Sequence, residues 1–228
     1  MLNPKTREVL RTLTSVTDSF ILESPRTTFV DEFKQVICSL NTEILDENFE
    51  NPIVINNMSN FLSTIDLIEN PEITITNRII DIKNEKSEAK YLTSDINSID
   101  KVKYSIIETT KKYDAVLNFK LSKEVLGTIK QAVQIFKSND TLFFKKENDN
   151  FSIVLGVNET FDMATNEFSI KIPEFESTKD FEVKVPVQSI LKLPNIDYNF
   201  EMKYNESKDA YRVYLSNVLL EIVISTIR

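Results

Sequence analysis

The stretches LSKEVLGTIK at residues 121–130 and PKTREVLRTL at residues 4–13 begin two copies of one pattern within 228 residues. In each copy, an amphipathic helix is accompanied by short alternating strands, a short second helix and further strands. Both opening helices carry a basic face, whereas the whole chain has a formal net charge of −8. Positive charge gathered on the helices of an acidic tandem protein indicates a surface that lies near nucleic acid without gripping it tightly.

Residue spacing defines the two basic faces. The first helix is predicted to start at Pro4, which suits a first helical turn, and Arg7 and Arg11 share one side because they are four residues apart. The second helix is predicted to start after Ser122, a plausible N-cap. Its lysines recur every seven residues and form a slowly drifting stripe at Lys123, Lys130 and Lys137.

Short strands outnumber helices in both halves. Runs of β-branched and aromatic residues predict strands at residues 19–22, 28–30, 35–44, 52–55, 72–77, 79–83 and 89–92, and again at 115–119, 141–145, 151–155, 167–172, 181–185, 198–204, 211–215 and 219–224. Shorter helices are predicted at residues 58–68 and 187–192, and residues 95–112 are interpreted as a linker with some extended structure. The pattern predicts an α+β fold of two tandem domains, residues 1–108 and 109–228, with antiparallel sheets and helices gathered on one face.

Several absences narrow the classes of function. The chain has no histidine, which removes Ser-His-Asp and Cys-His catalysis and histidine metal sites. Gly127 and Gly156 are its two glycines, so neither a phosphate-cradling loop nor a dinucleotide fingerprint is present. The single cysteine, Cys38, lies in an alternating apolar stretch and is interpreted as a buried, inert thiol. We expect no enzyme, and therefore no catalytic residue, cofactor or metal site.

The sequence also bears on location. No apolar run approaches the roughly 20 residues that a membrane helix needs. The N-terminus lacks the basic and then apolar pattern of a signal peptide. We therefore expect a cytoplasmic protein that makes no contact with a membrane.

The order of elements resembles a known family. The segments that carry the resemblance are residues 6–14 leading through 16–22, the helix start at residues 56–65, and residues 121–136 followed by 139–144 and 150–158. In order and in hydrophobic positions they resemble the sliding clamps of DNA polymerases, specifically the T-even type of tailed phages and, more distantly, proliferating cell nuclear antigen. The resemblance covers nearly the whole chain.

This resemblance implies a processivity factor. Three two-domain subunits would form a head-to-tail homotrimeric ring, with sheets outside and helices lining a central hole. Double-stranded DNA would thread the hole and be held topologically, independently of its sequence. The implied protein partners are a DNA polymerase, an ATP-dependent clamp loader and, in phages, late-transcription factors. A phage-encoded clamp would act in the cytoplasm of the host cell.

The resemblance also implies three sets of site residues. The DNA-facing set is Lys5, Arg7, Arg11, Lys123, Lys130, Lys137 and Lys192. The helix at residues 58–68 lacks lysine and arginine and carries Asp66, so it is poor in positive charge. A partner-peptide pocket is assigned to Val102, Tyr104, Ile106, Ile224 and Ile227. The subunit interface is assigned to Lys90, Tyr91 and Leu92 on one strand and Phe168, Ser169 and Ile170 on another.

Plainer interpretations stand beside these. The basic residues are also what ordinary solvated helix faces carry, and the apolar pocket residues are also what strands turn toward a core. A virion or tail structural protein of tandem β-rich domains would equally be acidic and lack catalytic residues. A carboxylate-based hydrolase stays open as well, although it leaves the repeated pattern unexplained.

Overall fold

The computed structural model describes residue 2 and residues 4–45, 51–76, 78–99, 102–157 and 167–227. The chain divides into two compact units, Met1–Glu32 with Cys38–Lys103, and Phe33–Ile37 with Tyr104–Arg228. The boundary therefore falls five residues before the predicted boundary between residues 108 and 109. No helix in the described part of the chain is long and apolar enough to cross a membrane.

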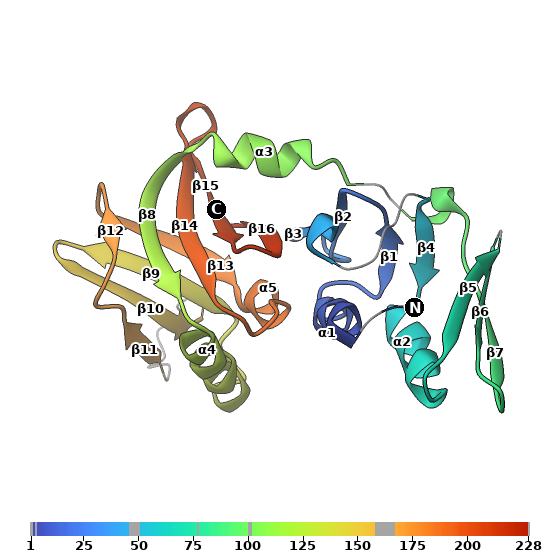
Figure 1. Ribbon diagram of the computed structural model, residues 1–228. Helices are drawn as coiled ribbons and strands as arrows, with labels where there is room; N and C mark the ends of the chain where they lie inside the picture. Colours follow the sequence, from blue (N-terminus) through green and yellow to red (C-terminus); the bar gives the residue numbers. More distant parts are fainter. Residues whose placement is uncertain are drawn as a thin grey trace. The chain divides into compact units, whose positions relative to one another are not determined.

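The first unit packs two helices near small antiparallel sheets (Figure 1). Its helices are α1 (Pro4–Leu13) and α2 (Met58–Leu67). The strand β1 (Ser19–Leu22) pairs with β4 (Ile53–Asn56), and β2 (Arg26–Val30) neighbours β3 (Val36–Asn41). A separate sheet has the order β5 (Glu72–Thr76), β6 (Ile79–Lys83) and β7 (Glu88–Leu92). Short 3₁₀ turns cover Thr42–Ile44 and Ile96–Ser98.

Apolar residues at helical spacing bury one side of each helix in this unit. Leu10 and Leu13 of α1 and Ile65 of α2 are fully buried. The ring of Phe61 packs edge-on against Tyr91 at 5.0 Å between centroids, which joins α2 to β7. Cys38 is also fully buried, and burial raises the pKa of its thiol. The interpretation of Cys38 as a buried thiol is therefore confirmed.

The second unit contains two larger sheets. One has the order β11 (Phe168–Lys171), β10 (Asn150–Gly156), β9 (Thr141–Glu147) and β13 (Phe181–Pro186). The other contains β12 (Glu176–Ser177), β8 (Asp114–Leu121), β14 (Tyr198–Asn205), β15 (Ala210–Ser216) and β16 (Leu220–Ser225). Its helices are α3 (Ser105–Lys111), α4 (Lys123–Ile135) and α5 (Val187–Leu191), and a 3₁₀ turn covers Glu206–Lys208.

A cluster of phenylalanines joins the two sheets of the second unit. Phe119 and Phe200 project from one sheet, and their rings lie 4.5 Å apart between centroids. Phe144 of the other sheet stacks on Phe200 at 5.1 Å, and Phe151 lies 5.2 Å from Phe119. Such aromatic contacts add to the free energy gained by burying the rings. The core of this unit thus forms where the two sheets face each other.

The structure confirms the predicted α+β class with antiparallel sheets and corrects three details. Residues 105–111 form α3, whereas residues 95–112 were predicted as a partly extended linker. The predicted strand at residues 35–44 ends at Asn41, where a 3₁₀ turn begins. The two-residue strand β12 was not predicted, because two residues are too few to show a periodicity.

Candidate nucleic-acid interface

In the first unit, one carboxylate links the two helices. Asp66 of α2 accepts a hydrogen bond from Nη1 of Arg7 at 3.1 Å and another from Nη2 of Arg11. Both arginines lie on α1, one turn apart, so they reach the same acid. The side chain of Arg7 is 22% exposed and that of Arg11 is 54% exposed. The charge of the two predicted DNA-facing arginines is therefore partly balanced within the helix pair.

The rest of α2 presents neutral polar groups. Its N-cap is Asn57, at a φ of 64°, and the Asn57 side chain accepts a hydrogen bond from the Asn60 N–H at 2.9 Å. Ser63 donates its hydroxyl hydrogen bond to the Ser59 carbonyl at 2.8 Å. Together α1 and α2 contain three basic and two acidic residues, a net charge of +1 in a chain of net charge −8.

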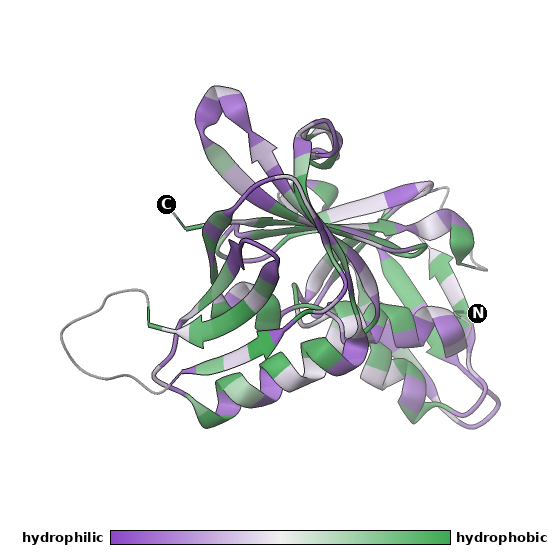
Figure 2. Cartoon of the chain, turned by 90° about the vertical axis from the view of Figure 1, so that its left-hand side faces the viewer, coloured by the Kyte–Doolittle hydropathy of each residue, from purple (hydrophilic) through white to green (hydrophobic). Residues whose placement is uncertain are grey.

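In the second unit, α4 and α5 form the corresponding helix pair. The Ser122 side chain accepts a hydrogen bond from the Val125 N–H at 3.3 Å, so the predicted N-cap is confirmed. Figure 2 shows α4 in the foreground with hydrophobic (green) and hydrophilic (purple) residues on successive turns, as expected for an amphipathic helix. Lys123 is exposed at the first position of α4, and Lys137 is exposed two residues beyond its last residue, Ile135.

The other two predicted lysines of this unit are engaged. Nζ of Lys130 donates a hydrogen bond to the Leu193 carbonyl at 2.5 Å, and burial lowers the pKa of Lys130. Lys192 ends α5, and its Nζ lies 4.8 Å from the centroid of the Phe33 ring. Lys5, Lys123 and Lys137 are exposed and have no ion-pair partner among the described residues.

The strands predicted for the subunit interface both lie at sheet edges. Within the described residues, β7 pairs only with β6, and β11 pairs only with β10. Leu92 at the end of β7 is 73% exposed, whereas Tyr91 donates its hydroxyl to the carbonyls of Asn56 and Asn57. Phe168 stacks on Phe136, and Ser169 is exposed. Lys90 is exposed and Ile170 is half-buried.

The residues predicted to capture a peptide have mixed environments. Val102, Ile106 and Ile227 are half-buried, and the Ile227 N–H donates to the Lys184 carbonyl at 2.8 Å. Ile224 is fully buried, because β16 turns its side chain into the core. It is therefore unavailable to a peptide in this conformation.

Tyr104 takes part in a polar cluster that holds α3 against the sheet. Its hydroxyl donates to Oε2 of Glu221 at 2.6 Å, and the Tyr214 hydroxyl donates to Oε1 of Glu221 at 2.7 Å. Lys111 also forms an ion pair with Glu221. Burial opposes ionisation of Glu221, but the hydrogen bonds from Lys111, Tyr104 and Tyr214 outweigh it and lower its pKa. Beneath this cluster, the fully buried Ile107 packs with Tyr214.

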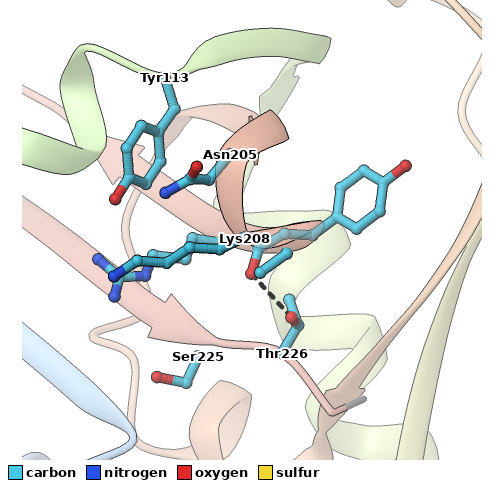
Figure 3. A pocket seen from close by; sticks show the side chains of 8 residues that line it. Tyr113, Asn205, Lys208, Ser225 and Thr226 are labelled. Carbon is cyan, nitrogen blue, oxygen red and sulfur yellow. Dashed lines mark hydrogen bonds between the residues drawn. The ribbon is translucent and has the colours of Figure 1, made fainter.

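A polar cavity of about 240 Å³ lies in the second unit, and two of its lining residues, Ser225 and Thr226, stand between the predicted pocket residues Ile224 and Ile227 in the sequence (Figure 3). It is bordered by the start of β8, the β14–β15 hairpin and the end of β16. Its lining residues are Tyr113, Asn205, Lys208, Ala210, Tyr211, Arg212, Ser225 and Thr226. No sequence pattern indicated this cavity, because its residues come from three separate segments.

Comparisons with known proteins bear on this architecture. No protein-family model and no curated protein matches the chain by sequence. Proliferating cellular nuclear antigen from Entamoeba histolytica matches in structure with a TM-score of 0.68 and 12% identity, over 97% of this chain and 94% of that one. The A. fulgidus PCNA structure with the C-terminal region of FEN-1 bound matches with a TM-score of 0.61 and 12% identity, over 97% and 94%.

A bacterial protein shows the same likeness. The Helicobacter pylori beta clamp bound to a DNA ligase peptide matches with a TM-score of 0.59 and 14% identity, over 98% of this chain. This chain spans 64% of the length of that beta clamp. These matches cover nearly the full length of the chain, which therefore has the fold of the DNA sliding clamps.

Proposed function

We propose that this chain is the subunit of a DNA polymerase sliding clamp, a processivity factor that encircles duplex DNA. The observation that carries the proposal is the clamp fold over 97% of the chain. The helix pairs α1–α2 and α4–α5, which bear a positive balance in an acidic protein, support it. Among clamps, the order of elements and hydrophobic positions favours the T-even type of tailed phages.

Sliding requires weak and interchangeable contacts with DNA. Phosphate contacts fix position without reading sequence, and each phosphate that a protein neutralises makes binding more sensitive to salt. Exposed Lys5, Lys123 and Lys137 supply flexible positive charge, while Asp66 restrains Arg7 and Arg11. We therefore expect low, salt-sensitive affinity for linear DNA and persistent retention on closed circles.

Ring closure is proposed to occur by pairing of β7 in one subunit with β11 in the next. Both strands are sheet edges within the described residues, and an unpaired edge exposes backbone N–H and C=O groups that favour pairing with another chain. Two different edges produce a head-to-tail contact, which closes into a ring when the rotation permits. We propose a homotrimer, as the resemblance implies.

The proposed partners are a DNA polymerase, an ATP-dependent clamp loader and late-transcription factors. Each would dock a short segment on the second unit, near α3 and the end of β16. Tyr104, Ile106 and Ile227 stay the candidate apolar contacts of this unit. The clamps of H. pylori and A. fulgidus support this mode, because they bind a DNA ligase peptide and the C-terminal region of FEN-1 respectively.

Absolute mass in solution tests the proposal. Light scattering across a dilution series is expected to show a species near three times 26.4 kDa that dissociates only on dilution. The same preparation, loaded with polymerase and loader, should remain on nicked circular DNA and leave after linearisation. A monomer at every concentration would remove the topological mechanism.

A further inference from the structure

The polar cavity of the second unit combines two cations with several hydrogen-bond donors. Lys208 and Arg212 both line it, and none of its eight lining residues is acidic. Figure 3 shows Tyr113, Asn205 and Lys208 gathered on one side, with Ser225 and Thr226 below the Lys208 side chain. In a chain with 35 acidic residues, a hollow bordered by two cations and no carboxylate is an unusual environment.

Neither cation is neutralised within the described part of the chain. No carboxylate there lies within 4.0 Å of Lys208 or Arg212. The nearest acid in sequence, Asp209, accepts a hydrogen bond from the Tyr204 hydroxyl at 2.8 Å. Asp209 also has a φ of 45°, which ends the 3₁₀ turn of the hairpin that carries Lys208. Two like charges beside one cavity repel each other, so an anion between them is favoured.

The guanidinium of Arg212 is held in position for such an anion. Its Nη1 donates a hydrogen bond at 2.9 Å to Oγ1 of Thr110, which is fully buried in α3. Its Cζ lies 5.9 Å from the centroid of the Tyr113 ring. A guanidinium has five N–H donors in a fixed fork, so donors remain for a carboxylate after this one bond. Arg212 is therefore already ordered in the unbound protein, and less conformational entropy is lost when an anion binds.

The hydroxyl and amide groups add directionality. Thr226 already donates to the Tyr211 carbonyl at 2.8 Å, and Oδ1 of Asn205 already accepts from the Ser207 hydroxyl at 2.8 Å. The amide nitrogen of Asn205 therefore stays available as a donor. The exposed Ser225 adds a hydroxyl donor at the cavity. These groups suit an acceptor-only ligand such as an ionised carboxylate.

Size and location distinguish between a peptide and a nucleic acid. About 240 Å³ is smaller than the roughly 300–1,000 Å³ of typical small-molecule pockets, so the cavity fits one side chain or a chain terminus. Figures 1 and 2 both place the β14–β15 hairpin at the end of the second unit opposite α4. DNA lying against α4 would therefore not fill the cavity. Two tyrosines on its wall also suit a peptide better than a lone phosphate.

We infer that this cavity binds a carboxylate, from an Asp or Glu side chain or a C-terminus, of an acidic segment in a partner protein. The inference rests on the proposed function, because it specifies the chemistry of the partner segment that a clamp would dock. Arg212 grips the carboxylate with its free N–H groups, and Lys208 closes over it from the hairpin.

Selection from a random peptide display library tests the inference on the full chain. Peptides enriched on the wild-type protein are expected to be rich in Asp and Glu and to lose enrichment on Lys208→Gln. Fluorescence anisotropy at about 0.1 M salt, where the Debye length is about 10 Å, then compares an enriched peptide with its Asn and Gln counterpart. We expect the neutral peptide to bind about tenfold more weakly to wild type, which corresponds to about 1.4 kcal/mol.

Matched variants locate the effect. Lys208→Gln and Arg212→Gln should abolish the discrimination, whereas Lys120→Gln, which removes an exposed lysine from β8, should keep it. Lys208 is exposed and forms no hydrogen bond or ion pair within the described structure, so its variant should unfold at the wild-type temperature.

Three results would overturn the inference. The first is a selection that enriches only neutral peptides or enriches no peptide. The second is equal discrimination between the acidic and neutral peptides by Lys208→Gln and Lys120→Gln. The third is displacement of the peptide by duplex DNA or inorganic phosphate at concentrations below the Kd of the peptide. Light scattering and retention on circular DNA are measured on the same samples. If the protein is trimeric and retained on circular DNA but does not discriminate between the peptides, the carboxylate site alone is refuted. If trimer formation and retention are absent as well, the clamp proposal is refuted.

Discussion

Replacing Asp66 with asparagine tests whether the α1–α2 surface faces DNA. Asp66 accepts hydrogen bonds from both Arg7 and Arg11, and it is the acid through which α2 restrains them. Asp66→Asn keeps the shape of the side chain and removes one negative charge from each subunit. We expect tighter binding to linear DNA with a steeper dependence on salt, because the two arginines become free to reach phosphates.

The magnitude follows from the exposure of these groups. Asp66 is 45% exposed and Arg11 is 54% exposed, so removing the ion pairs should cost about 1 kcal/mol of folding free energy or less. Each additional phosphate that the arginines neutralise should steepen the slope of log K against log[salt] by about 0.9. Between 50 and 200 mM salt, one such phosphate should weaken binding by a further factor of about 3.5.

Anisotropy of a labelled linear duplex, titrated across that salt range, measures the slope. Glu85→Gln is the matched control, because it removes the same charge from an exposed turn of the first unit between β6 and β7. A slope that is unchanged in Asp66→Asn, or an affinity gain equal to that of Glu85→Gln, would show that the α1–α2 surface does not contact DNA.

Four further outcomes are expected. Reversing the charge of exposed Lys123 should lower retention on circular DNA, and circular dichroism should stay unchanged. The slope of log K against log[salt] should fall by about 1 for each phosphate that the helix no longer neutralises. Unchanged retention would show that α4 does not face DNA. Leu92→Asp, at a site 73% exposed on edge strand β7, should yield monomers by light scattering, and a persisting trimer would move the interface elsewhere. Glu221→Gln should cost about 1–2 kcal/mol at pH 7 in urea unfolding. Hydrogen bonds led by the one from Lys111 lower the pKa of Glu221 in the folded protein. Their stabilisation is therefore present above the pKa of this carboxyl in the unfolded chain and is lost as the pH falls through its pKa in the folded protein, so the unfolding free energies of wild type and variant should converge in acid. A difference in unfolding free energy that does not change with pH would contradict this. Ser122→Ala should cost about 1 kcal/mol in thermal unfolding by removing the α4 N-cap, and no change would show that the cap bond contributes nothing.

Local patterns in the sequence predicted most elements well. The strands at residues 19–22 and 79–83 begin and end where expected, and Ser122 caps α4. These features depend on residues within a few positions of one another, through side-chain periodicity and capping hydrogen bonds. The same local view failed for α3, whose seven residues include two fully buried side chains, Ile107 and Thr110. So short a helix depends on the surface that covers it.

The candidate site was predicted only in part. Sequence spacing placed Lys123 and Lys137 at exposed positions of one helix; both are exposed in the structure, but α4 ends at Ile135, before Lys137. It treated Lys130 as equivalent to them, although its ammonium bonds a carbonyl 63 residues away. The sequence analysis also counted Asp66 only as a reason why α2 is poor in positive charge, whereas its carboxylate binds two arginines more than 50 residues away in the chain.

The sequence by itself determined the α+β class, the basic character of the opening helices and the exclusion of histidine chemistry, because these depend on composition and on neighbours along the chain. Only the tertiary structure decided which cations are paired and which strands are left at sheet edges. It alone brought Lys208 and Arg212 together beside one cavity with Tyr113 and Ser225. Periodicity shows which side of an element is apolar, but the charge and hydrogen-bond partners of a site are set by residues that only folding brings into contact.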